Sequence, residues 1–204
     1  MAESGVRMGG IVLCGGRSRR MGTSKAWLRC GREYLLQRVV RIVAEVADPV
    51  VVAARSDQEL PPLPDGIGVV HDAVADCGPL AGIAAGFDAL AGRCDVAFVT
   101  PCDHPLLEPA FISRLTQLLG EHRAVVPTRG KQWYPLTAVY RLDTQVILED
   151  MLARGELPAH RFAERCAPHL ATESELLAAD PHLDSLLNVN DPEDYQRVMK
   201  ALEE

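Results

Sequence analysis

The stretch GIVLCGGRSRRMGTSK, residues 10–25, decides the fold, because it joins an apolar run to a basic loop that contains glycine. The apolar part, GIVLC (10–14), has no polar alternation, which is typical of a strand covered by helices on both faces. Gly15 and Gly16 have no Cβ atom, so the backbone after this strand can turn sharply and bring its N–H groups against an anion. The pattern predicts a phosphate-binding loop at the end of a buried strand.

Positive charge is concentrated in the same loop. Arg17, Arg19, Arg20 and Lys25 fall within it, although the whole chain has 28 acidic and 21 basic residues and a formal charge of −7. Such a cluster suits a polyphosphate. The loop is not a Walker A motif, because Ala26 follows the lysine, and its glycines do not fit GxGxxG either. Charge and glycine alone also allow a solvated basic turn.

Apolar runs and amphipathic segments alternate along the chain. The segments 34–46, 79–92 and 109–120 predict helices, and the last two begin with Pro and end with Gly. This alternation predicts an α/β fold with a three-layer, doubly wound, mostly parallel sheet, whose ligand crevice lies at the carboxyl ends of the strands. The further runs expected as buried strands are VVVAA (50–54), IGVV (67–70), DVAFVT (95–100), AVVPT (124–128) and TAVYR (137–141).

From about residue 143 onward the strand signal fades and short helical stretches take over. The last helix has a clear start, because Asp191 can cap it, Pro192 suits its first position and Asp194 lies near the positive end of its dipole. The 204 residues fit one domain, 1–204, and no linker divides them.

The composition excludes several classes of protein. The acidic charge balance disfavours nucleic acid as a partner, because neutralising phosphates requires a basic face. Six cysteines without a CxxC pair indicate neither a zinc site nor a disulfide framework. No apolar run approaches the roughly 20 residues of a membrane span, and the first residues lack a secretory signal. We therefore expect a cytoplasmic protein without a membrane partner.

Two carboxylates follow predicted strands. Asp72 comes after the 67–70 run and Asp103 after the 95–100 run, so a parallel sheet brings both to the edge that carries the glycine loop. Either aspartate alone would be interpreted as a turn residue or a helix cap. A carboxylate at this edge can hold Mg²⁺, which commonly bridges to substrate phosphates. The convergence of the aspartates with the basic loop predicts a magnesium-nucleotide site.

Other polar and aromatic residues near these positions are less informative. His71 and His104 adjoin the aspartates, but without a cluster at metal-ligand spacing they are interpreted as polar loop residues. Trp133 and Tyr134 could stack on a flat heterocycle or pack on the sheet, and both interpretations stay open.

The segment LCGGRSRRMGTSK (13–25) resembles the LAGGxSxRMGxxK signature of nucleotidyltransferases that join a nucleoside triphosphate to a phosphorylated acceptor. The resemblance extends to the molybdenum cofactor guanylyltransferase family. It spans nearly the whole chain in the expected order. The similar segments are HDAVADCGPLAGI (71–83), TPCDHPLL (100–107), WYPLTAVYR (133–141) and LLNVNDPEDY (186–195).

The resemblance implies transfer of GMP from GTP to the terminal phosphate of molybdenum-molybdopterin, with release of pyrophosphate. It also leaves room for proteins that deliver or accept the cofactor. Lys25 and Arg20 would neutralise phosphate charge, and Asn188 and Asn190 would lie near the reaction centre. The implied GTP contacts are Leu13, Cys14, Gly15, Lys25, Asp72 and Asp103, with Asp103 also the ligand of Mg²⁺.

This chain departs from the family pattern in places. Cys14 replaces the usual alanine, and residues 53–55 read AAR where some members have an asparagine that contacts GTP. Glycine at both 15 and 16 favours the guanylyl branch, because the cytidylyl relatives usually read AAG there. The alternatives are a cytidylyltransferase on the same cofactor and a sugar-phosphate or polyol-phosphate nucleotidyltransferase. A noncatalytic GTP-binding regulatory module is a further alternative.

Overall fold

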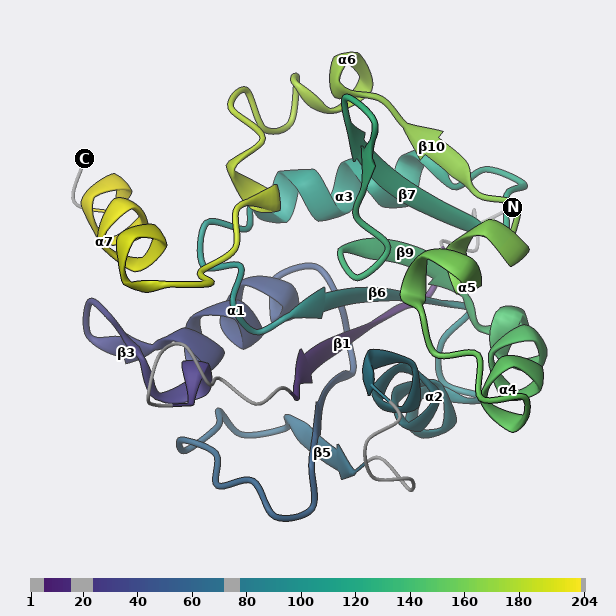
Figure 1. Cartoon of the computed structure of the whole chain (residues 1–204), viewed down its shortest axis with the longest axis horizontal. Coiled ribbons are helices and arrows are strands. Elements are labelled where there is room, and N and C mark those ends of the chain that lie inside the picture. Colours follow the sequence, from purple (N-terminus) through teal and green to yellow (C-terminus); the bar gives the residue numbers. More distant parts are fainter. Residues whose placement is uncertain (1–5, 16–23, 72–77, 203–204) are drawn as a thin grey trace, which may run out of the picture.

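The computed structural model describes residues 6–15, 24–71 and 78–202. Figure 1 shows strands with helices packed along both sides. The strand order of the main sheet is β10-β7-β9-β6-β1-β4-β5, with β8 paired to β7. Inside it, β1 (Met8–Cys14) lies between two parallel neighbours, β6 (Val96–Pro101) and β4 (Val50–Ala54). The first apolar run is therefore an inner strand, as its sequence predicts.

The outer strands make the sheet mixed. On one side, β5 (Gly68–His71) continues the parallel arrangement next to β4. On the other side, β9 (Ala138–Arg141) is antiparallel to both β6 and β7 (Ala124–Arg129). The short β10 (His169–Ala171) is parallel to β7, and β8 (Gln132–Trp133) is antiparallel to it. The prediction of a mostly parallel α/β sheet is confirmed, with β9 as an antiparallel insertion.

Each face of the sheet carries its own apolar core. Val12 of β1 packs into one core with α1 and α3, whereas Ile11 points into the other with α2, α4 and α5. Alternate residues of one strand thus serve opposite layers, which confirms the three-layer arrangement. These helices are α1 (Leu35–Ala44), α2 (Gly78–Leu90), α3 (Pro109–Leu118), α4 (Gln145–Ala153) and α5 (Ala159–Arg165).

The remaining elements are short, except the last helix. Figure 1 shows α7 (Pro192–Ala201) beside the small hairpin of β2 (Arg29–Cys30) and β3 (Glu33–Tyr34), and the Tyr195 hydroxyl donates a hydrogen bond to Arg29 O at 2.6 Å. The side chain of Asp191 accepts the N–H groups of residues 193 and 194, so the predicted cap is confirmed. The other short helices are η1 (Lys25–Trp27), η2 (Leu142–Thr144), α6 (Glu173–Leu176) and η3 (Asp184–Leu186).

Two expectations about the strands are wrong. The 67–70 run was expected to be buried on both faces, but β5 pairs only with β4, its residues alternate in exposure and Val69 is 43% exposed. The strand signal was expected to end near residue 143, yet β10 completes the opposite side of the sheet. Three residues are too few to produce a readable pattern, and β10 forms because β7 offers it a partner.

No helix in the three described ranges is long and apolar enough to cross a lipid bilayer.

Candidate functional site

The candidate site begins where β1 and β6 end side by side. The two strands are parallel, and the N–H of Cys102 donates to Leu13 O at 2.9 Å, which extends their pairing past the end of β6. Asp103 follows directly, so it lies beside the chain that leaves β1 at Gly15. The aspartate and the start of the glycine loop therefore meet at one edge of the sheet, as a parallel arrangement requires.

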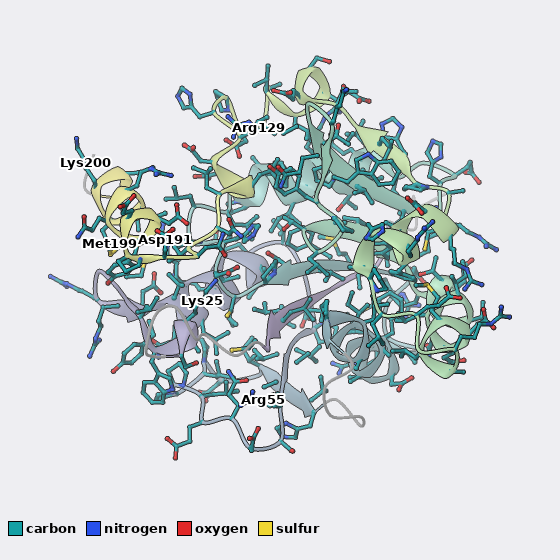
Figure 2. The ribbon with its side chains drawn as sticks, viewed as in Figure 1. Lys25, Arg55, Arg129, Asp191, Met199 and Lys200 are labelled. Carbon is teal, nitrogen blue, oxygen red and sulfur yellow. The ribbon has the colours of Figure 1, made fainter. Side chains whose placement is uncertain are left out.

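Lys25 and Asp103 form the central contact of the site. Lys25 opens η1, and its Nζ lies 2.7 Å from Asp103 Oδ2. Their side chains are 20% and 14% exposed, so solvent screens this pair less than an ordinary surface ion pair. Figure 2 shows Lys25 between the central strands and the C-terminal segment that carries Asp191.

The C-terminal segment contributes two asparagines to the same place. Lys25 Nζ donates to Asn190 Oδ1 at 3.2 Å, and the amides of Asn188 and Asn190 hydrogen-bond each other at 3.1 and 3.4 Å. The N–H of Val189, between them, donates to Asp103 O at 2.9 Å. Residues 165 positions apart in the sequence are thereby fixed around one ammonium group.

A cavity of about 150 Å³ opens at this edge of the sheet. Its volume is smaller than the roughly 300–1,000 Å³ typical of small-molecule sites. The described residues therefore enclose only part of the space that a nucleotide would need. Arg20 and Asp72, expected at this site, lie outside the described residues. The cavity is lined by Leu13, Cys14, Gly15, Ser24, Lys25, Ala26, Gln58, Pro101, Cys102 and Asp103.

The second oxygen of Asp103 is suited to a cation. Asp103 Oδ1 is buried, has no hydrogen-bond partner within the described ranges, and lies 3.9 Å from His104 Nε2. A buried carboxylate oxygen without a donor is unfavourable unless a bound group compensates it. Across the described ranges, no three His, Cys, Asp or Glu side chains gather to form a metal cage. Mg²⁺ fits such a position, because it commonly binds one or two carboxylates and completes its shell with phosphates and water.

His104 is a buried structural residue, not the polar loop residue that the sequence suggests. It is 4% exposed, and its Nδ1 lies 3.0 Å from Ser185 O and 3.3 Å from Thr137 Oγ1. Burial lowers the pKa of its imidazole, against a weaker opposite effect of Asp103. His104 therefore fixes the Asp103 turn to η3 and to the loop before β9, which no local sequence signal reveals.

Asp180 also supports the Asp103 turn, through its hydrogen bonds to η3. It is 3% exposed, and its carboxylate accepts the N–H groups of Asp184 at 3.1 Å and Ser185 at 2.8 Å. Because Ser185 contacts His104, Asp180 indirectly positions the turn that carries Asp103. The sequence did not single it out, since an aspartate before a proline looks like any turn residue.

The other aromatic, histidine and cysteine candidates make contacts within the fold. Trp133 packs on the core that contains Ile11, and Tyr134 packs on the opposite core, as the packing interpretation predicts. His71 Nδ1 lies 3.2 Å from Ala54 O at the end of β4. A side-chain hydrogen bond with Cys14 and burial raise the pKa of the Cys102 thiol well above its usual value.

The fold and this edge define a class, the α/β proteins that bind a nucleotide where the first strand ends. The chain matches the family described as the MobA-like NTP transferase domain over residues 10–172. It is 32% identical over 189 residues to a probable molybdenum cofactor guanylyltransferase of Pelotomaculum thermopropionicum, covering 91% of this chain and 88% of that protein. The chain therefore belongs to the family of MobA-like NTP transferases.

Solved structures share the fold. The molybdopterin-guanine dinucleotide biosynthesis protein A of Archaeoglobus fulgidus superposes with a TM-score of 0.79 at 22% identity, over 96% of this chain and 99% of that one. A Mycobacterium tuberculosis protein crystallised in complex with manganese gives a TM-score of 0.63 at 16% identity, over 96% and 99% of the two chains. At these identities the likeness concerns the arrangement of strands and helices.

Replacing Asp180 tests the support of the site. Asp180→Ala leaves two N–H groups near η3 without their acceptor, so we expect the free energy of unfolding to fall by about 2 kcal/mol or more. Urea denaturation followed by circular dichroism measures this loss. The exposed Asp65→Ala is the matched control and should stay within about 0.5 kcal/mol of the parent protein. Equal stabilities of the two variants would contradict this role of Asp180.

Proposed function

We propose that this chain transfers GMP from GTP to the terminal phosphate of molybdenum-molybdopterin and releases pyrophosphate. Family membership and the guanylyltransferase relatives at about a third identity over most of the chain support the reaction. The observation that carries the proposal is the meeting of Lys25, Asp103 and Asn190, because it brings a cation, a carboxylate and an amide to one edge of the sheet.

The chemistry is substitution at the α-phosphorus of GTP. An oxygen of the acceptor phosphate forms the new bond to this phosphorus, and the bond to the oxygen that bridges to the β-phosphate breaks. The acceptor is already an anion, so no strong general base is required. Because both reactants are negative, positioning and charge neutralisation dominate the catalysis.

Each residue has a role in this scheme. Lys25, with Arg20, neutralises phosphate charge and stabilises the departing pyrophosphate. Asp103 would hold Mg²⁺ through its buried Oδ1, and a bound ion would supply charge neutralisation at the phosphates. Asn188 and Asn190 orient the reacting groups from the C-terminal side. Leu13, Cys14, Gly15 and Asp72 complete the nucleotide contacts.

The reaction is tested with purified protein, Mg²⁺ and molybdenum-molybdopterin, to which GTP, ATP or CTP is added in turn. Mass spectrometry of the products should detect the guanine dinucleotide with GTP and much less product with the other two. A preference for CTP would assign the chain to the cytidylyl alternative. Absence of product with every triphosphate, despite nucleotide binding, would favour a noncatalytic GTP-binding module.

Removal of the lysine tests the central contact. Lys25→Ala removes the ammonium group next to Asp103, and we expect turnover with GTP to fall about 10²-fold or more. The matched control is Lys200→Ala, which removes an exposed lysine of α7 and should leave turnover unchanged. Near-normal turnover of Lys25→Ala, with the fold intact by circular dichroism, would exclude Lys25 from the mechanism.

A further inference from the structure

Gln58 places an unusual amide in the wall of the cavity. It lies in the loop after β4 and lines the same cavity as Lys25 and Asp103. Its Nε2 donates to Cys14 Sγ at 3.3 Å, while its Oε1 is buried and has no hydrogen-bond partner among the residues that the structure describes. One end of the amide is therefore anchored on β1, and the other end is an acceptor that lacks a donor.

The backbone around Gln58 is fixed on both sides. Its N–H donates to Arg55 O at 3.1 Å and closes a turn, and Arg55 Nε donates to Asp57 at 3.0 Å inside that turn. On the other side, Trp27 Nε1 donates to Glu59 O at 3.1 Å and ties the loop to η1. The amide is thus held in place before any ligand arrives, which lowers the entropic cost of using it.

The unpartnered atom restricts what it can contact. A buried carbonyl oxygen without a donor is costly, and a ligand that supplies an N–H or O–H group removes that cost. A phosphate offers only acceptor oxygens, so Gln58 Oε1 repels this part of a nucleotide. In the proposed function, the phosphates lie next to Lys25 and next to the Asp103 oxygen that is suited to a cation. The part of the nucleotide that contacts Gln58 is therefore the base or the ribose.

We infer that Gln58 determines base specificity by accepting a hydrogen bond from the 2-amino group of guanine. This inference rests on the proposed function, in which GTP occupies the cavity. Guanine presents its 2-amino group next to the N1–H, so two neighbouring donors face one acceptor. Adenine and cytosine present a ring nitrogen acceptor beside their amino group, which a carbonyl oxygen repels. Residues 53–55, where some family members have an asparagine, contain no side-chain amide in this chain. Gln58 is the first residue after β4 that has one.

Inosine triphosphate tests this contact, because its base differs from guanine only in lacking the 2-amino group. We expect the protein to bind GTP about ten-fold more tightly than ITP, the ratio typical of one lost hydrogen bond to a buried acceptor. Gln58→Met removes the acceptor at similar length and should bring this ratio close to one. Gln58→Glu keeps an acceptor oxygen and should retain the preference for GTP, even where its overall affinity is lower.

The measurement is equilibrium binding of GTP, ITP and 2′-deoxy-GTP by calorimetry with Mg²⁺ and without an acceptor, so it does not depend on transfer. The matched control is Gln145→Met, because Gln145 lies on α4 and bonds Asp88 and Glu149. Equal losses of GTP and ITP affinity in Gln58→Met would overturn the inference, since they indicate a structural role. The inference would also be overturned if Gln58→Met changed the ratio of GTP to 2′-deoxy-GTP affinity and left the ratio of GTP to ITP affinity unchanged. That result would indicate that Gln58 contacts the ribose.

These binding data, combined with the GMP transfer assay described above, separate this inference from the proposed function. Selective GTP binding that depends on Gln58, together with no GMP transfer, supports the inference and contradicts the reaction. GMP transfer with an unchanged GTP-to-ITP ratio in Gln58→Met contradicts the inference alone. Absence of nucleotide binding by the parent protein would overturn both.

Discussion

The carboxylate of Asp103 places two different demands on the fold. One oxygen binds the ammonium group of Lys25, whereas the other is buried and has no donor in the part of the chain that the structure describes. Such an oxygen is unfavourable on its own, so the surrounding structure has to hold it in place. Parallel pairing of β1 and β6 fixes the turn, and His104, Ser185 and Asp180 support it from the side of η3. The chemistry that we propose depends on this constraint.

The arrangement also explains why the C-terminal segment matters. Val189 contacts the Asp103 turn and Asn190 contacts Lys25. A C-terminal segment therefore forms the site together with residues from the first part of the chain. Gln58 approaches the same cavity from the loop after β4. In the function that we propose, the phosphate contacts and the base contact come from different loops of one sheet edge, so the base contact could vary while the Lys25–Asp103 pair is kept.

The sequence predicted those features that follow from a local pattern of residues. Apolar runs located β1, β4 and β6, Pro and Gly marked α3, and the positions after parallel strands brought Asp103 to the glycine loop. The family resemblance supplied Asn188 and Asn190. Three-residue β10 and the edge position of β5 depend on pairing partners, which a local pattern does not contain. Gln58, His104 and Asp180 act through contacts distant in sequence, so their residue types alone gave no signal.

Manganese binding tests the central claim most directly, because Mn²⁺ replaces Mg²⁺ in many phosphate sites and is visible by electron paramagnetic resonance. Mn²⁺ is titrated into the protein with GTP present, for the parent chain and for Asp103→Asn. The account predicts a protein-bound Mn²⁺–GTP complex in the parent chain and at least about ten-fold weaker binding of it in the variant, since an amide oxygen carries no charge. Equal binding of the complex by both proteins would contradict the account.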